Sequence, residues 1–358
     1  MNTASKFLVG SLMLLVACGE DAEDPPADTQ TSSGPTSSGS SSSGPTAGET
    51  SGPGSTGATG ESTGSGEPAP DTSDGDGTSE TTDGATTDTT GSPSLTVELV
   101  AEVFSAPESA HFHAATEQWF VSNIAGDSGA PDGLGWVTRV DRDGDVLDGQ
   151  WVADLDSPAG ITSDAANLFV TDINRIHVLD VETAQEVDTF DVPMAAFLND
   201  PVLAPDGTLY VSDSFAQAIW AVDADQVPSV VVQDEALDFP NGMLWQDDQL
   251  LIGSTGPFTD FAAEGPLHRL DVGLGTLQLV RGVTGKFDGL ADGDAAVWMT
   301  DFRGSLLRLE GDAITASHDL TAYGLMSAAD LGYDAEQSTL VVPDLLGDQI
   351  AFVQLPPG

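Results

Sequence analysis

The sequence predicts an all-β fold, a six-bladed β-propeller over residues 95–358, because one short phrase recurs along this segment. The phrase is a polar turn, a short apolar strand and then a small or acidic residue. It reads QWFVSNI from Gln118, NLFVTDI from Asn167, TLYVSDS from Thr208, QLLIGST from Gln249, AVWMTDF from Ala296 and TLVVPDL from Thr339. The period, about 40 to 50 residues, is that of a four-stranded propeller blade. No amphipathic helix of ordinary length interrupts the pattern.

A second observation concerns closure of the ring. Each phrase is usually followed by another strand, such as RIHVLD or AIWAVD, which gives six units that start near Pro107 and end with a unit near Leu325. The last unit is one strand short. The stretch LTVELVAEVFSA, Leu95–Ala106, has no blade of its own and is expected to supply the missing outer strand, which removes exposed strand edges. A β-sandwich is the alternative, but it predicts regular strands without a repeated phrase.

The N-terminus predicts export and lipid attachment. The apolar run that follows Lys6 (residues 7–17) is too short to span a bilayer of about 30 Å and fits a secretory signal. LVAC resembles the lipobox of bacterial lipoproteins, which implies that residues 1–17 are removed and that Cys18 is lipidated. An ordinary signal peptide that contains a cysteine is the alternative. Gly19 follows where an Asp would favour inner-membrane retention, so we expect a lipid-anchored protein of the outer membrane, with the periplasmic or surface face left open.

Residues 18–94 are predicted to be a disordered, acidic linker. They consist almost entirely of Ser, Thr, Gly, Pro, Asp and Glu and carry no apolar periodicity. Such a segment cannot bury enough apolar surface to offset its ordering entropy. A flexible chain of about 75 residues reaches about 50 Å on average, which would hold a domain clear of the membrane.

Charge and cysteine content exclude several classes of partner. The 358 residues carry a net charge of -49 with only nine Lys and Arg, which argues against nucleic acid because phosphate binding needs clustered cations. Cys18 is the only cysteine, so a lipidated chain has no disulfide and depends on core burial. We expect a monomer that touches the membrane through its lipid anchor only.

Acidic and amide residues occupy one place in the repeat, just before the repeated strand. They are Glu108 in PESAHF, Asn199 and Asp200 in FLNDP, Asn241 in FPNGMLW, Asp288 in KFDGLA and, a little deeper in its unit, Asp330. Each alone is more typical of a turn, since NG and DG are common turn dipeptides. Their shared phase indicates more, because the innermost strands of a propeller line one channel. Gathered carboxylate and amide oxygens suit a hard cation such as calcium, whereas the lack of thiols argues against structural zinc.

This ordered set resembles the regucalcin, gluconolactonase and luciferin-regenerating enzyme family of six-bladed propellers, from about Leu95 to Leu355. The resemblance implies that Glu108, Asn241 and Asp288 bind a divalent metal, calcium first, with manganese or zinc as alternatives. It also implies that Asn199 and Asp200 flank the substrate. The expected function is a metal-dependent hydrolase that opens a lactone or related ester, with Asp288 as metal ligand and candidate general base.

Two positions qualify the resemblance. Family members that act on sugar lactones often carry an Arg two residues before the ND pair, where this chain has Phe197, so the substrate is left open. His111 falls where relatives often have a His near the mouth of the site, which implies a substrate contact. The alternative for His111 is a hydrogen-bonded core histidine that shares a strand face with His113. DRDGD, residues 141–145, lacks the later Gly and Glu of a calcium loop and is expected to be a hairpin turn.

Two other functions stay open. One is a non-catalytic propeller that binds a protein or glycan at the cell surface, with any metal serving the structure. The other is a lyase of the streptogramin-inactivating type, which is also a propeller. Metal binding without turnover would favour the binding module over the hydrolase.

Overall fold

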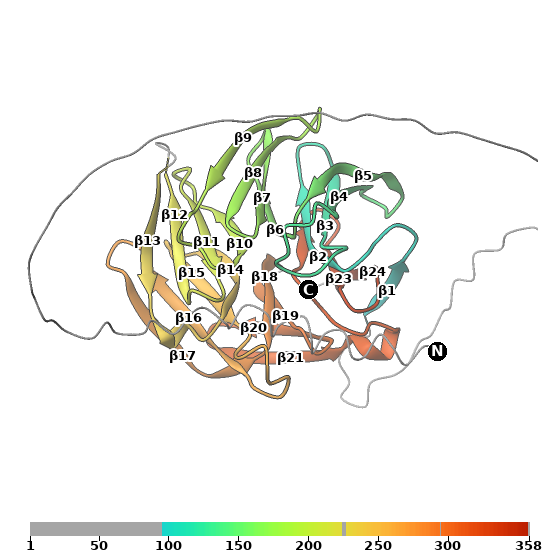
Figure 1. Cartoon of the computed structure of the whole chain (residues 1–358). Helices are drawn as coiled ribbons and strands as arrows, with labels where there is room; N and C mark the ends of the chain where they lie inside the picture. The colour runs from blue at the N-terminus through green and yellow to red at the C-terminus, as the bar shows by residue number, and fades with distance from the viewer. Residues whose placement is uncertain (1–94, 224–226, 294, 357–358) are drawn as a thin grey trace, which may run out of the picture. The chain divides into compact units, whose positions relative to one another are not determined.

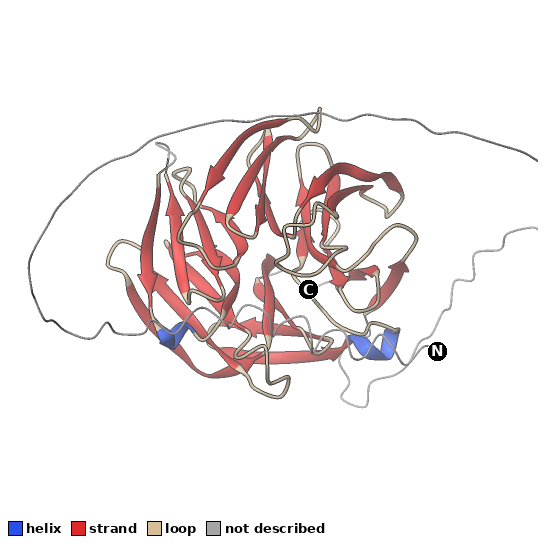
Figure 2. Ribbon diagram, in the orientation of Figure 1, coloured by secondary structure: helices blue, strands red, loops and turns tan. Residues whose placement is uncertain are grey.

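The computed structural model describes residues 95–223, 227–293 and 295–356, which form six four-stranded antiparallel sheets around a common axis (Figure 1). The predicted all-β six-bladed propeller is confirmed. Strands and loops make up almost all of this region, joined by two short 3₁₀ helices, η2 (Glu235–Leu237) and η3 (Leu320–Tyr323) (Figure 2). No helix in the described ranges is long and apolar enough to cross a membrane. The predicted signal peptide, Cys18 and the linker lie outside the described residues.

The first five blades each run from the innermost to the outermost strand in chain order. Blade 1 contains β2 (Pro107–His113), β3 (Gln118–Asn123), β4 (Gly135–Asp141) and β5 (Val146–Leu155). Blade 2 contains β6 (Pro158–Ser163), β7 (Asn167–Asp172), β8 (Arg175–Asp180) and β9 (Glu186–Asp191). Blade 3 contains β10 (Leu198–Leu203), β11 (Leu209–Asp213), β12 (Ala218–Val222) and β13 (Pro228–Gln233). Blade 4 contains β14 (Pro240–Gln246), β15 (Gln249–Ser254), β16 (Gly265–Asp271) and β17 (Thr276–Gly285). Blade 5 contains β18 (Phe287–Gly293), β19 (Ala296–Asp301), β20 (Ser305–Glu310) and β21 (Ala313–Asp319).

Blade 6 closes the ring with a strand from the other end of the domain. It contains β22 (Gly332–Asp334), β23 (Thr339–Asp344), β24 (Gln349–Gln354) and, as its outermost strand, β1 (Thr96–Val100). β1 pairs antiparallel with β24, from Thr96 opposite Gln354 to Val100 opposite Ile350. The expectation that Leu95–Ala106 supplies the missing outer strand is therefore confirmed, and β1 is that strand. It ties the first and last blades together and leaves no open end of the ring.

The hydrophobic core lies between neighbouring blades. Alternate residues of the second strand of each blade are buried toward one neighbour or the other, as period-two alternation requires. Phe120 of blade 1 packs with Leu168 and Val170 of blade 2, while Trp119 of the same strand packs with Val341 of blade 6. Every blade thus depends on both neighbours for its buried surface.

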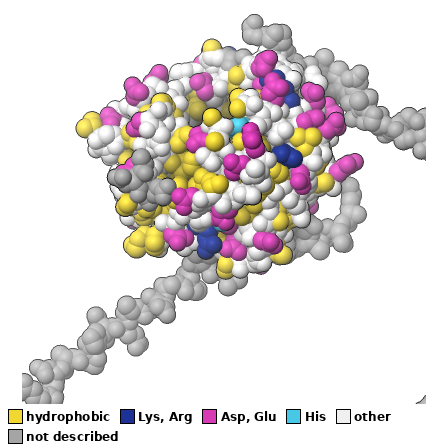
Figure 3. Space-filling model, turned by 90° about the horizontal axis from the view of Figure 1, so that it is seen from above, with side chains coloured by type: hydrophobic (Ala, Val, Ile, Leu, Met, Phe, Trp, Pro, Cys, Tyr) yellow, Lys and Arg dark blue, Asp and Glu magenta, His cyan; other side chains and the backbone are white. Residues whose placement is uncertain are grey.

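The surface is rich in carboxylates, as the net charge of the chain requires. Figure 3 shows acidic side chains spread over one face of the domain, with only a few basic side chains among them. Four of the arginines in the described ranges form ion pairs with Asp or Glu, namely Arg142, Arg269, Arg303 and Arg308. Such a surface attracts cations and keeps the domain soluble by self-repulsion.

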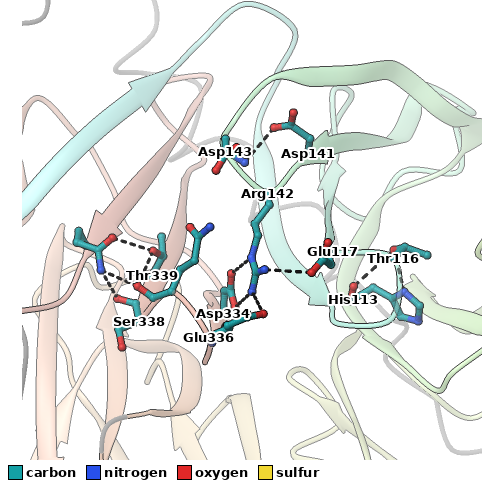
Figure 4. Close-up of polar contacts among 12 residues, drawn as sticks. His113, Thr116, Glu117, Asp141, Arg142, Asp143, Asp334, Glu336, Ser338 and Thr339 are labelled. Atoms are coloured by element: carbon teal, nitrogen blue, oxygen red, sulfur yellow. Dashed lines mark hydrogen bonds and ion pairs between the residues drawn. The ribbon is translucent and has the colours of Figure 1, made fainter.

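Arg142 joins blade 1 to blade 6 at the closure seam (Figure 4). It lies in the predicted hairpin turn between β4 and β5, and its guanidinium donates to both carboxylate oxygens of buried Asp334, at 2.6 and 2.8 Å. It also donates to Glu336 at 2.8 Å and to Glu117 at 3.2 Å. The guanidinium carbon lies 5.3 Å from the centre of the Phe112 ring, a cation–π distance. Paired, two-pronged contacts of this kind are the strong class of ion pair.

We expect Arg142→Met to lower the melting temperature, because it leaves the Asp334 carboxylate buried without its cation. Burial is the largest single effect and raises the pKa of Asp334, but the hydrogen bonds from Arg142 and from the backbone, together with the charge of Arg142, hold this pKa below the ordinary value. A lowered pKa adds stability above the ordinary Asp pKa, about 3.9, and this stability is lost as the pH falls through the lowered value. The melting-temperature difference from the parent should therefore be constant above about pH 5 and shrink below about pH 4.

The matched control is Arg269→Met, which removes an ion pair to exposed Asp312. A surface pair of this kind contributes little, so its melting temperature should stay close to that of the parent at every pH. Two results would contradict a stabilising role for the Arg142–Asp334 ion pair. One is the same melting temperature for both variants, and the other is an effect of Arg142→Met on melting temperature that does not depend on pH.

Candidate functional site

A register shift marks the start of the innermost strand in blades 1 to 5. In β14, pairing moves from Pro240–Ser254 directly to Met243–Ile252, which leaves Asn241 and Gly242 in a bulge. The same shift occurs in β2, β6, β10 and β18. A bulge bends its strand and re-aims its side chains. Four candidate residues hold the first bulge position of their blades, namely Glu108, Asn199, Asn241 and Asp288.

Glycine holds the second bulge position in three blades because neighbouring inner strands approach closely there. A Cβ on Gly242 would overlap the backbone oxygen of Asp288 and lie 2.7 Å from Leu290 Cδ1. A Cβ on Gly289 would lie 2.7 Å from the Cα of Asp330. The NG and DG pairs therefore lie within strands β14 and β18, and the turn interpretation of each pair taken alone is wrong.

The four first-position side chains meet at one cavity of about 270 Å³. Glu108, Asn199, Asn241 and Asp288 come from four different blades, and all are buried. In an antiparallel pair, the start of the inner strand lies beside the end of the second strand. The cavity therefore opens on the face of the propeller that is formed by the starts of the inner strands and by the turns that follow the second strands. Its floor is thus acidic and amide, as the shared phase in the repeat predicts.

Several oxygens of the site have no hydrogen-bond partner among the residues that the structure describes. Glu108 Oε2, Asn199 Oδ1 and Asn241 Oδ1 are buried and unpartnered, whereas the amide nitrogens are used. Asn241 Nδ2 donates to Asp288 Oδ1, and Asn199 Nδ2 donates to Ser214 Oγ at 3.3 Å. The amide oxygens are thus left for something other than protein. Leaving such atoms unpaired costs about 1–3 kcal/mol each, which a cation bound to them would recover.

Burial and mutual repulsion raise the pKa of the carboxyls at the hub. For Glu108, burial comes first, followed by the charges of Asp288 and Asp330. For Asp288, burial and Asp330 raise the pKa, and the hydrogen bond from Asn241 opposes them. Burial raises the pKa of Asp330 to about 7. The clustered carboxyls therefore resist full ionisation, and a divalent cation bound among them would favour their ionised form.

Asp200 lies one residue beyond the lining side chain of Asn199 on β10, and Asp330 lies two residues before β22. Ser109 Oγ donates to Asp330 Oδ2 at 2.5 Å, and Ser109 and Asp330 form a bridge between blades 1 and 6. Both carboxylate oxygens of Asp200 are buried without a partner, and burial and the charge of Asp330 raise its pKa. The structure thus places Asp200 outside the cavity lining, where substrate contact would have to pass the first layer.

His111 lies away from the cavity. It is three residues beyond Glu108 on β2, about 10 Å farther along the strand, and its Nε2 shares a hydrogen bond of 2.7 Å with Ser163 Oγ. Burial, with a smaller effect of His113, lowers its pKa to about 4. This placement favours the hydrogen-bonded interior histidine over the substrate contact that the resemblance implies.

Lys286 is a lining residue that sequence reasoning missed. Its Nζ donates to the backbone oxygens of Thr255 at 2.9 Å and of Pro257, Asp260 and Ala263 at 3.3 Å each. Burial lowers its pKa. It precedes Asp288 by two residues in KFDGLA, and a Lys beside a candidate ligand was the one signal that could have singled it out.

The candidate metal donors are mixed in type. Among the described residues, no three His, Cys, Asp or Glu side chains are grouped so that they could hold a metal ion. The site instead combines the carboxylates of Glu108 and Asp288 with the amide oxygens of Asn199 and Asn241. An all-oxygen set of this kind fits calcium, which takes six to eight oxygen ligands and accepts water for the remainder.

Fold and site together define a class, a six-bladed propeller with an acidic and amide cavity on its axis. Solved structures that resemble it include a luciferin-regenerating enzyme, with 11% identity over 73% of this chain and 96% of that one, at a TM-score of 0.55. A gluconolactonase from Xanthomonas campestris has 17% identity over 73% and 90%, at 0.52. A chain of a nidogen–laminin complex has 17% identity over 63% and 84%, at 0.52.

These likenesses show the fold alone, because the identities are low and the same fold serves an enzyme and a complex of two proteins. In sequence, no protein-family profile and no curated protein matches the chain. Any argument about function must therefore rest on the residues of the site.

Proposed function

We propose that the chain is a metal-dependent hydrolase that opens a lactone or related ester. The observation that carries the proposal is the cavity floor, where donors from four blades converge and three of their buried oxygens lack a protein partner. The fold does not require a polar side chain at this position, since blade 2 has Ala159 at the first bulge position. Propeller neighbours that are gluconolactonases make a lactonase-like hydrolase plausible for the fold.

The metal ligands are proposed from the donor set. Glu108, Asn241 and Asp288 would hold the cation, with Asn199 beside it facing the substrate. Calcium is the first choice, because the described residues that line the cavity supply oxygen donors and no thiol or imidazole. A bound divalent cation supplies Lewis-acid polarisation of the ester carbonyl.

Asp288 is the candidate general base. It lines the cavity, and Asn241 Nδ2 holds its Oδ1, which orients the carboxylate. Its proposed step is to take the proton of the water that attacks the carbonyl carbon, and the ester C–O bond then breaks to give a carboxylate and an alcohol. Asn199 Oδ1, unpartnered and on the floor, would orient the substrate or the water.

Calcium is expected to raise the melting temperature of the chain, and Glu108→Gln to remove most of this rise. A ligand that binds only the folded state stabilises it by about 2.7 kcal/mol at 100 times its dissociation constant. Gln keeps the size of the side chain but removes one charged donor. The measurement is thermal unfolding against calcium concentration, with isothermal titration of the same samples.

The control is Asp206→Asn, which changes an exposed carboxylate in the turn between β10 and β11. It should show the calcium response of the parent. If the parent itself shows no response to calcium, manganese or zinc, the metal site does not exist.

We further propose that Cys18 anchors the domain by lipid to the outer membrane, with residues 18–94 as spacer. The support is the lipobox-like LVAC and the composition of the segment that follows. The domain then acts outside the cytoplasm on a small molecule, as a monomer that meets the membrane through the anchor only.

The competing function is a non-catalytic propeller that binds a protein or glycan at the cell surface. The likeness to a chain of a nidogen–laminin complex keeps it open. Calcium binding with no turnover of any lactone or ester would favour it over the hydrolase.

A further inference from the structure

Five phenylalanines surround the cavity above its acidic floor. They come from four separate segments: Phe197 before β10, Phe215 after β11, Phe258 and Phe261 after β15, and Phe302 after β19. Phe215 is the centre of the group, with its ring 5.5 Å from those of Phe197 and Phe258. Phe261 and Phe302 pair at 6.3 Å. The rings are arranged edge to face or tilted, as aromatic contacts prefer.

The fold does not require these rings. None of the five belongs to the six hydrophobic clusters between blades that form the core of the described domain. All five are partly or well exposed, and Phe261 is 52% exposed. A contiguous exposed apolar surface at the mouth of a cavity is typical of a ligand site, because it otherwise costs solubility.

No lining side chain in the described part of the chain is a free cation that could pair with an anionic substituent. Among the described residues, Lys286 is the one basic side chain that lines the cavity, and four backbone oxygens already engage its Nζ. A calcium ion held by the two carboxylates of the floor would be neutralised by them, which leaves no net positive charge there for an anionic substituent. The substrate group that enters should therefore be uncharged.

Lys286 also fixes the loop that carries two of the rings. Its four acceptors all lie between Thr255 and Ala263, the segment that holds Phe258 and Phe261. A loop held this way presents its rings without first having to order them, and such preorganisation favours binding.

The cavity volume sets the size of the group. An apolar cavity of about 150 Å³ is enough to bind benzene. The present cavity, about 270 Å³, has room for a five-membered lactone ring together with an apolar group of about six carbons.

We propose that the substrate is an uncharged lactone or ester with an apolar substituent, a ring or chain of about six carbons, that packs among the five phenylalanines. The inference rests on the proposed function, since it assigns the reacting carbonyl to the acidic floor. It excludes a polyhydroxylated sugar lactone, for which the aromatic walls offer no hydrogen-bond partners.

The test is hydrolysis by the calcium-loaded chain of γ-butyrolactones with hydrogen, methyl, propyl, hexyl or phenyl at the γ carbon, beside D-glucono-1,5-lactone. Burial of each methylene predicts a rise in kcat/KM of about fourfold until the cavity is filled. Phe215→Ala and Phe258→Ala should flatten this dependence, and both positions are partly exposed, so folding should survive. Leu274→Ala, which removes a well-exposed apolar side chain from the turn between β16 and β17, should keep the dependence of the parent.

Binding of the matching γ-lactams, which resist hydrolysis, separates failure of the inference from failure of the proposed function. Lactam affinity that rises with substituent length, without hydrolysis of any lactone, supports the aromatic site and overturns the hydrolase. Hydrolysis that is independent of the substituent, or fastest for gluconolactone, overturns the aromatic site and supports the hydrolase. No binding and no hydrolysis overturn both.

Discussion

Replacing Asp288 by Asn should lower kcat by about 10²–10⁴-fold on any lactone or ester that the chain hydrolyses, the usual contribution of a general base. Asn has the same shape and can still accept the hydrogen bond from Asn241 at its oxygen. It cannot take a proton from water, and it removes one of the two carboxylates on the cavity floor. The measurement is kcat and KM at saturating calcium.

The melting temperature of metal-free Asp288→Asn distinguishes a loss of catalysis from a loss of folding. Burial and the charge of Asp330 raise the pKa of Asp288, so its ionised form is disfavoured in the folded chain. A raised carboxyl pKa means that stability falls as the pH rises through it. Asp288→Asn removes this loss, so at pH 8 its metal-free melting temperature should equal or exceed that of the parent. Activity within threefold of the parent in a folded variant would remove Asp288 from the mechanism.

Gly242→Ala should destabilise the domain by about 3 kcal/mol and disturb the site, although it adds one methyl group. A Gly-to-Ala change at an unstrained position usually stabilises by about 0.4–1 kcal/mol, so the sign is informative. Gly242 has no positive φ. The effect must therefore come from the Cβ, which overlaps the Asp288 backbone oxygen and pushes β18 away from β14.

The expected fall in melting temperature is about 6–12 °C, from about 2–4 °C per kcal/mol for a domain of this size. Calcium affinity should fall with it, because the same contact sets the spacing of Asn241 and Asp288. Gly273→Ala is the control, since its Cβ would meet only Asp271 Oδ1, at 3.5 Å. Equal melting temperatures for the two variants would mean that the inner strands can separate without cost.

The repeated phrase was sufficient to predict the blades because strand pattern and turn chemistry are local properties. A period-two strand between polar turns has the same meaning wherever it occurs, so six copies indicated six blades. The missing strand of blade 6 and the spare strand at Thr96–Val100 could be matched for the same reason. Convergence of Glu108, Asn241 and Asp288 followed from phase alone, because a ring places equivalent positions around one axis.

Single dipeptides were less informative. NG and DG have the composition of turns, yet Gly242 and Gly289 lie within strands. Glycine is needed at both positions because the neighbouring blade lies close, and the local sequence pattern does not reveal that distance. His111 was similarly ambiguous, since its spacing from Glu108 along β2 decides whether it reaches the cavity.

Residue periodicity by itself determined the all-β class, the number of blades and the residues that share the axial position, because each is a property of the order of residues along the chain. Only the tertiary structure decided which oxygens lack partners, that Lys286 is engaged by four backbone oxygens, and that five phenylalanines from four segments form the walls of one cavity. These features arise between segments far apart in the sequence, and packing of the blades, rather than any local preference, brings them together.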